Sequence, residues 1–271
     1  VFVGCQSKQH DQAVNAANAR WYQMRSELML NMAQQRFDTG DLDQAQSTLR
    51  EAMSVHPTNP ELYVLAGRIE LERGKLEKAY RLLDTALKFD EDRADAFYYQ
   101  GLVLQRWQRF DEALGKYEKA FAAEPDNVAY LTAASEMDVA TRGPDAAIER
   151  LESKIDYFDQ SASLRLTMAH LYLMKRDYTQ AAHWFEKASI LKPDDTKLRE
   201  ELAKAQIAAG NHKPAIRNLK SLLADGELKD RPDLKRALAN AYIATGENRE
   251  AREAYLELSR TDAMTASDWV Q

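Results

Sequence analysis

Residues 94–127 read ADAFYYQGLVLQRWQRFDEALGKYEKAFAAEPDN, and the rest of the chain repeats their spacing of small, large and aromatic residues. The clearest mark of the repeat is one alanine every 34 residues, at Ala45, Ala79, Ala113, Ala147, Ala181 and Ala215, with Ala251 following after 36. A period of this length is typical of a unit made of two helices and a turn. The spacing therefore predicts a stack of helical hairpins.

Two further features of each unit support this prediction. Glycine marks the turn at Gly40, Gly74 and Gly210, while Gln108, Arg142 and Arg176 occupy the same slot in the other units. Small residues at the eighth, twentieth and twenty-seventh slots allow neighbouring helices to approach closely, and larger apolar residues fill the remaining space. Because one hairpin cannot bury enough surface alone, we expect stability to come from stacking.

These slots resemble the tetratricopeptide repeat family over residues 26–259. The resemblance implies an all-α fold, a right-handed superhelical α-solenoid of about seven repeats at 26–59, 60–93, 94–127, 128–161, 162–195, 196–231 and 232–259. The fourth repeat departs from the pattern, with Arg142-Gly143-Pro144 at its turn and Lys154 in a small-residue slot. Residues 226–232 add two further residues. Both irregularities are either flex points or ordinary drift between repeats.

The two ends lie outside the repeat pattern. Residues 1–9 place Val3-Gly4 before Cys5, the only cysteine, and resemble the lipobox of bacterial lipoproteins. This resemblance implies acylation of Cys5 and, because Gln6 follows it, an outer-membrane protein facing the periplasm. The alternatives are an unmodified cysteine in a flexible leader and a cytoplasmic protein. We expect residues 10–25 to form a helix capping the stack, with Trp21 in contact with it, and residues 260–271 to form a tail or begin another helix.

Composition and motifs exclude several classes of function. A formal net charge of −6 and the lack of a basic stripe argue against nucleic-acid binding. No nucleotide-binding, hydrolase or zinc-protease motif occurs, and the five histidines share no metal-ligand spacing. No apolar run is long enough to cross a membrane. The sequence therefore predicts a non-enzymatic protein without cofactor, metal or small-molecule substrate.

The candidate binding residues follow from the family resemblance, which implies that the first helix of each repeat lines a concave groove. The corresponding slots contain Arg68, Tyr98, Tyr99, Leu102, Glu136, His170, Lys204 and Asn240. We expect Tyr98, Leu102 and Arg68 to form the centre of a peptide-binding patch, since tyrosine offers contact area and a hydroxyl. The alternative is that Tyr98 only packs against the second repeat.

The expected function is a protein-interaction scaffold or adaptor that binds a peptide or helix in this groove, at a bacterial envelope. The cationic clamp of chaperone-tail receptors is missing, since Glu27, Glu61 and Asp95 occupy part of it. An acidic rim instead favours a neutral or basic segment. Assembly of pili, secretion apparatus or the envelope is the expected setting. A self-oligomerising module, or the repeat portion of a larger enzyme or regulator, is the alternative.

Overall fold

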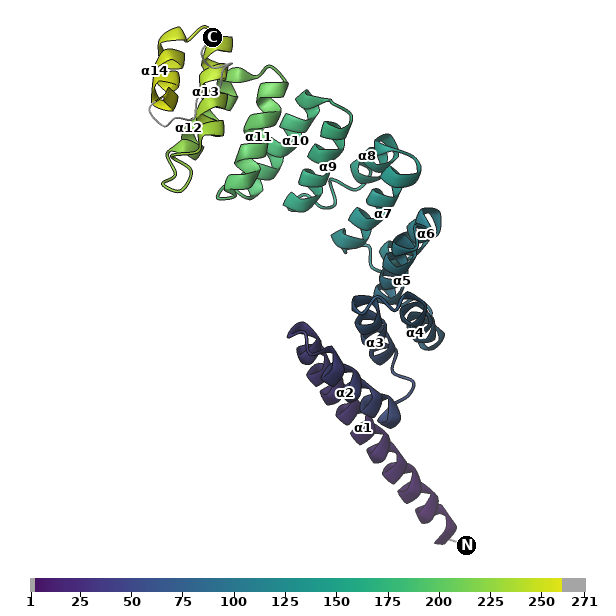
Figure 1. Ribbon diagram of the computed structural model, residues 1–271. Coiled ribbons are helices and arrows are strands. Elements are labelled where there is room, and N and C mark those ends of the chain that lie inside the picture. Colours follow the sequence, from purple (N-terminus) through teal and green to yellow (C-terminus); the bar gives the residue numbers. More distant parts are fainter. Residues whose placement is uncertain (1–2, 260–271) are drawn as a thin grey trace. The chain divides into compact units, whose positions relative to one another are not determined.

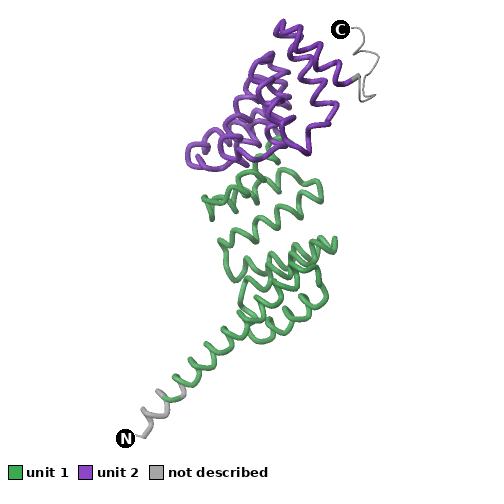
Figure 2. Tube along the Cα trace, turned by 90° about the vertical axis from the view of Figure 1, so that its left-hand side faces the viewer, with its two compact units in different colours: residues 1–141 green, residues 142–271 purple. Residues whose placement is uncertain are grey.

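The computed structural model describes residues 3–259, and every regular element in that range is a helix (Figure 1). The chain divides into two compact units, residues 1–141 and 142–271 (Figure 2). The first unit contains α1 Val3–Asp38, α2 Leu42–Val55, α3 Pro60–Glu72, α4 Leu76–Phe89, α5 Ala94–Arg106, α6 Phe110–Ala123 and α7 Val128–Thr141. The second contains α8 Pro144–Glu152, α9 Ala162–Met174, α10 Tyr178–Leu191, α11 Thr196–Ala208, α12 His212–Leu223, α13 Pro232–Thr245 and α14 Asn248–Ser259.

Consecutive helices pair as the 34-residue period predicts. Helices α1 and α2, α3 and α4, and α5 and α6 form hairpins in the first unit, as α9 and α10, α11 and α12, and α13 and α14 do in the second. In the first unit α1 also contacts α3, and α3 contacts α5. The first helices of successive hairpins therefore lie side by side. The predicted all-α solenoid of helical hairpins is confirmed.

The small-residue slots lie where helices pack most closely. Alanines of the twentieth slot, such as Ala45 and Ala113, are completely buried. A Cβ atom added to Gly67 would lie 2.8 Å from Cγ of Leu83, and one added to Gly101 would lie 2.5 Å from Cε1 of Tyr117. Only a small residue fits at these positions, because a larger side chain at either glycine would separate the two helices of its hairpin.

The turn slot requires a left-handed backbone in most units. Gly40, Gly74 and Gly210 have φ values of 82°, 71° and 76°. Gln108 and Arg176, which replace glycine in the same slot, also have positive φ values, of 60° and 59°. The conformation is therefore imposed by the hairpin and is adopted even by residues whose Cβ disfavours it.

The N-terminal helix differs from the expected division into a leader, a capping helix and a repeat helix. A single helix, α1, runs from Val3 to Asp38 because no glycine or proline interrupts residues 5–39. The side chains of residues 12–24 are all exposed, so this part does not cover the stack. Trp21 is 50% exposed and contacts Tyr22 and Arg25 of the same helix. The side chain of Cys5 and residues 260–271, the expected tail, lie outside what the structure describes.

The division between the units falls within the irregular fourth repeat. Helix α7 ends the first unit, and α8 begins the second after Gly143, whose φ is 90°. Helix α8 ends at Glu152, before the slot of Lys154, whose side chain is exposed. Lys154 therefore does not occupy a close helix contact, and its charge stays in water.

Candidate binding surface

The first unit presents a row of side chains along α1, α3, α5 and α7, most of them at least partly exposed, which we call the first-helix face. Its members are Phe37, Arg68, Tyr98, Tyr99, Leu102, Tyr130 and Glu136. All except Tyr130 and Glu136 are half-buried; Tyr130 is 7% exposed, whereas Glu136 is exposed. Tyr99 and Leu102 pack against the core of the α3–α4 hairpin, which includes Val64 and Leu71.

Arg68 is held between two aromatic rings. Its guanidinium carbon lies 4.6 Å from the ring centroid of Phe37 and 5.2 Å from that of Tyr99. Its Nη1 donates a hydrogen bond to Oε1 of Gln34 at 3.0 Å. No carboxylate among the described residues forms an ion pair with Arg68. Its position is therefore fixed by stacking and a neutral hydrogen bond, and its charge is not neutralised.

Tyr98 is the centre of an aromatic cluster. Its ring centroid lies 5.3 Å from that of Tyr99, 5.6 Å from Tyr117 and 5.1 Å from Tyr130. Tyr117 belongs to α6 and Tyr130 to α7, so Tyr98 packs toward the following helices rather than only against the second repeat. Such ring contacts stabilise beyond the area that they bury. Tyr98 is thus both a packing residue and part of the partly exposed face.

Burial and nearby carboxylates control the ionisation of this surface. Burial raises the pKa of Tyr98 above its ordinary value, and the negative charge of Glu136 raises it further. Burial also raises the pKa of Tyr99, although the positive charge of Arg68 opposes this effect. Partial burial raises the pKa of the Glu136 carboxyl. The tyrosines are therefore neutral hydrogen-bonding groups at physiological pH.

The three candidate residues of the second unit form separate contacts. His170 Nε2 lies 3.3 Å from Oε2 of Glu201, and its ring contacts Phe185. Lys204 Nζ lies 2.6 Å from Oε1 of Glu200, which also pairs with Arg231. Asn240 Oδ1 accepts a hydrogen bond from the Tyr255 hydroxyl. Each of the three residues therefore pairs with a different neighbouring side chain, and no printed contact brings them together into one cluster.

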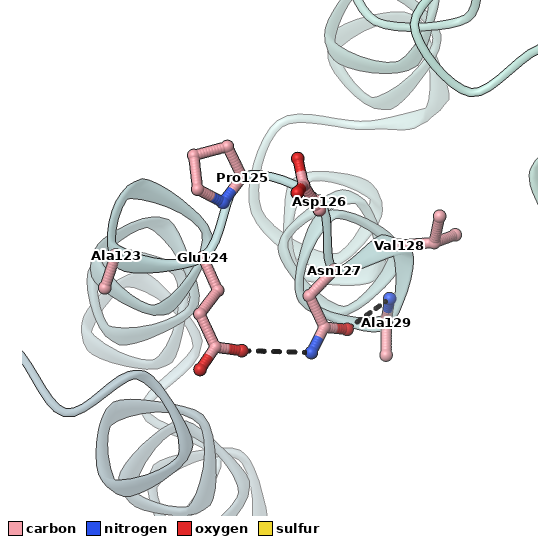
Figure 3. A pocket seen from close by; sticks show the side chains of 7 residues that line it. All are labelled: Ala123, Glu124, Pro125, Asp126, Asn127, Val128 and Ala129. Atoms are coloured by element: carbon pink, nitrogen blue, oxygen red, sulfur yellow. Dashed lines mark hydrogen bonds between the residues drawn. The ribbon is translucent and has the colours of Figure 1, made fainter.

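A cavity of about 650 Å³ lies elsewhere, at the turn between α6 and α7 (Figure 3). It is lined by residues 123–129. Asn127 bridges this turn, because its Nδ2 donates to Oε2 of Glu124 at 3.4 Å and its Oδ1 accepts from the amide of Ala129 at 3.1 Å. Among the side chains that the structure describes, no three histidine, cysteine or acidic residues are grouped so that they could hold a metal ion. The part of the chain that the structure describes contains no helix long and apolar enough to span a membrane.

Residues 36–103 match the family model described as a tetratricopeptide repeat. The chain is 29% identical over 116 residues to the beta-barrel assembly-enhancing protease of Escherichia coli K12, covering 43% of this chain and 24% of that protein. It is 31% identical over 100 residues to cellulose synthase operon protein C of Pseudomonas fluorescens, covering 36% and 8% respectively. The chain thus spans a quarter or less of the length of these relatives.

Solved structures are similar over more of the chain. Pseudomonas aeruginosa pilF matches with a TM-score of 0.62 at 16% identity, over 74% of this chain and 91% of that one. The C-terminal part of a TPR repeat-containing protein from Cytophaga hutchinsonii matches with a TM-score of 0.70 at 16% identity, over 88% and 97%. Together with the family match, these similarities identify the fold as a helical solenoid of tetratricopeptide repeats.

The repeat pattern predicted that Arg68, Tyr98, Tyr99 and Leu102 share one face, and the structure brings them together. The pattern did not identify Tyr130 as part of the same surface. The signal in the sequence was an aromatic residue in the first turn of the next first helix, where it can reach back toward the preceding hairpin. The pattern assigned Tyr117 only to packing, and its ring contacts that of Tyr98. The Tyr117 hydroxyl donates a hydrogen bond to Oε1 of Gln105 at 2.8 Å.

Proposed function

We propose that this protein is a non-catalytic interaction protein that binds a peptide segment or helix of a partner on the first-helix face of its first unit. The observation that carries this proposal is the half-buried pair Tyr98 and Tyr99 on α5, with the guanidinium of Arg68 stacked on Tyr99. No carboxylate among the described residues forms an ion pair with Arg68. Aromatic and arginine side chains dominate binding energy at protein interfaces.

The fold supports this class of function. Stacked hairpins present an extended surface rather than a closed pocket, and tetratricopeptide repeat proteins typically mediate protein–protein interactions. The preformed stacking of Arg68 on Tyr99 lowers the entropy lost when a partner binds, because these side chains are already ordered. A bound segment would therefore find aromatic contact area, hydrogen-bonding groups and an unpaired positive charge together on the first-helix face.

Site-specific photo-crosslinking tests this proposal. With p-benzoylphenylalanine in place of Tyr99, we expect a specific adduct in cells of the native species, identified by mass spectrometry. The matched control is the same substitution at Tyr80, a half-buried tyrosine on the second helix α4 that contacts Trp107. Adducts of equal yield at both positions, or none at position 99, would contradict binding on the first-helix face.

We further propose that the protein acts at a bacterial outer membrane, on its periplasmic side, and is anchored by a lipid on Cys5. The lipobox resemblance supports this location, and the relatives named for beta-barrel assembly and cellulose synthesis are compatible with it. Two acyl chains suffice for stable membrane anchoring. A Cys5→Ser variant should move from the membrane fraction to the soluble fraction. Continued membrane association of that variant would argue against the anchor.

A further inference from the structure

The outer side of α1 carries a continuous apolar stripe. Its members are spaced alternately three and four residues apart, at Val14, Ala17, Trp21, Met24 and Leu28. Side chains at this spacing are neighbours on one side of a helix. All five are exposed, and Met24 and Leu28 each keep 62% of their surface open. No neighbouring helix in the described chain therefore buries this stripe.

The stripe lies opposite the face with which α1 packs on the hairpin stack. Ser26 and Ala33 are completely buried, and Ala33 belongs to the core shared with α2 and α3. Each residue turns a helix by about 100°, so Leu28 points about 160° away from Ser26 and about 180° away from Phe37. Phe37 is the member of the first-helix face that α1 contributes. A partner on the stripe would therefore leave the first-helix face open.

The first half of α1 has no other support within the described chain. It extends beyond α2, and the side chains of residues 12–24 are all exposed (Figure 1). Most helical stability in proteins comes from packing of an apolar face, and an isolated helix of this length is marginal in water. A second helix lying along the stripe would supply the missing packing.

The spacing of the stripe and the charges beside it favour another helix as the occupant. Apolar residues that alternate at three and four residues are the positions through which two helices pack in a coiled coil. The positions that flank them hold Arg20 and Glu27, and neither side chain forms an ion pair within the described residues. Flanking charges of this kind decide which helices pair and in which orientation. Helix α1 carries both signs, so a second α1 can complement it.

Only one arrangement of two α1 helices brings these opposite charges together. In a parallel pair, Arg20 would lie opposite Arg25 of the other copy, and the two would repel. In an antiparallel pair with Trp21 beside Met24 of the other copy, Arg20 lies opposite Glu27 on both sides of the two-fold axis. Sliding one helix by a heptad would instead set Arg20 against Arg20 or Glu27 against Glu27. Charge complementarity therefore selects one antiparallel register.

We propose that two copies of this chain associate through antiparallel packing of their α1 helices along this stripe. Trp21 then packs on Met24 of the second copy, a favourable sulfur–aromatic contact, and the large Leu28 faces the small Ala17. The contact covers about five turns of each helix, which is small for a protein interface, so we expect a dissociation constant of about 10–100 μM. At lower concentrations the chain is monomeric, and the stripe does not affect its melting temperature.

Sedimentation equilibrium of the full chain tests the dimer, from about 2 to 200 μM to bracket this dissociation constant. All samples carry Cys5→Ser, so that neither acylation nor a disulfide joins two copies. We expect monomer at the lowest concentration and mostly dimer at the highest. Met24→Lys should weaken association by about tenfold or more, because it places a charge in the apolar contact. A monomer at every concentration, or a dimer that Met24→Lys leaves unchanged, would overturn the proposal.

The matched control is Ile190→Lys on α10, which replaces an exposed apolar side chain outside the stripe. It should change the dissociation constant by less than about twofold, because surface substitutions away from a contact have small effects. Equal weakening by Met24→Lys and Ile190→Lys would indicate unspecific association of apolar surface and would overturn a dimer through α1.

Charge reversal tests the orientation of the two helices. Arg20→Glu and Glu27→Arg should each weaken the dimer about fivefold, because each replaces two attractions with two repulsions. The double variant Arg20→Glu/Glu27→Arg should recover the original affinity. Stronger association of Arg20→Glu alone would indicate a parallel pair and would contradict the antiparallel register.

A lipid surface is the other occupant that suits an exposed apolar stripe on a helix. Cosedimentation of the same full chain with vesicles of phosphatidylethanolamine and phosphatidylglycerol distinguishes lipid from a second copy. We expect the chain to stay in the supernatant. Vesicle binding that Met24→Lys abolishes, together with a monomer in solution, would assign the stripe to lipid and overturn the dimer. Neither result alters the proposed function, because the first-helix face lies on the other side of α1.

Discussion

At the scale of single residues, Gly101 makes room for the ring of Tyr117. A Cβ atom at Gly101 would lie 2.5 Å from that ring, so we expect Gly101→Ala to lower the free energy of unfolding by about 2 kcal/mol through overpacking. Gly115 in α6 has no atom within 4 Å of an added Cβ, so Gly115→Ala should raise the free energy of unfolding by about 0.5–1 kcal/mol. Urea denaturation measures both. If both substitutions changed the free energy of unfolding in the same way, the helices would have moved apart at Tyr117 without a loss of stability.

Gln108 and Arg176 store strain at their turns. Both have left-handed backbone conformations, which cost a residue with a Cβ about 1 kcal/mol relative to glycine. Gln108→Gly and Arg176→Gly should each raise the free energy of unfolding by about that amount, measured by thermal unfolding. Gly74→Ala, in the same slot with a φ of 71°, should have the opposite effect. Destabilisation by Gln108→Gly would mean that the side chain makes a compensating contact.

Single-residue packing was largely predictable from the sequence, but the binding surface was predictable only in part. The 34-residue phase identified Ala113 and Gly101 as close contacts because sterics allow only small residues there. The same phase placed Arg68 and Tyr99 on one face. It could not predict that Arg68 stacks between Phe37 and Tyr99, because several rotamers of a long side chain fit the same helix position.

At the scale of elements, the first half of α1 contributes little to the hairpin stack. The side chains of residues 12–24 are exposed, whereas Ser26 and Ala33 are completely buried. A chain beginning at Arg25 keeps the contact between Arg25 and Glu51, which is 3.0 Å. We expect its melting temperature to lie within about 2 °C of that of the full chain, since exposed positions contribute little stability. A much larger decrease would mean that the removed residues do cover the stack.

Glu70 connects three helices and makes their association sensitive to pH. Glu70 belongs to α3. Its carboxylate is fully buried and contacts Gln46 of α2 and Lys78 of α4. Burial alone would raise the pKa of Glu70, but the hydrogen bonds and charges of Lys78, with Gln46 and Lys75, lower it overall. The stabilisation is therefore present above the ordinary pKa of 4.5 and is lost as the pH falls below it.

The corresponding prediction concerns Glu70→Gln. The variant should be less stable than the wild type at pH 7, and the difference should shrink as the pH is lowered toward about 3, because protonation removes the same charge from the wild type. Urea denaturation at several pH values measures this difference. Glu77→Gln, at an exposed position of α4, is the control and should show no such trend. A constant difference at all pH values would exclude an ionic role for Glu70.

Helix boundaries were predictable where glycine or proline marks a turn, and less so elsewhere. The continuity of α1 across residue 25 follows from helix propensity alone, since no residue there ends a helix. Whether its first half packs on a neighbour could not be predicted, because exposure depends on where the other helices lie. The early end of α8 at Glu152 was signalled only by Lys154, a large charged residue in a small-residue slot.

At the scale of the whole molecule, the candidate residues are distributed over two units. Arg68, Tyr98, Tyr99, Leu102 and Glu136 belong to residues 1–141, and the other three to residues 142–271. We expect a fragment of residues 1–141 to unfold cooperatively, because it contains its own core clusters, and to retain capture from position 99. Circular dichroism and the crosslinking assay test this. Capture only by the full chain would show that the second unit contributes to binding.

The contact between Gly101 and Tyr117 also limits how this surface could be transferred to another protein. Tyr98 rests on Tyr117, and Tyr117 needs the space above Gly101. Grafting Arg68, Tyr98, Tyr99 and Glu136 onto a different repeat scaffold would therefore fail to reproduce the surface unless glycine and tyrosine were transplanted with them. A graft of the surface residues alone would carry the same side chains without the packing that positions Tyr98.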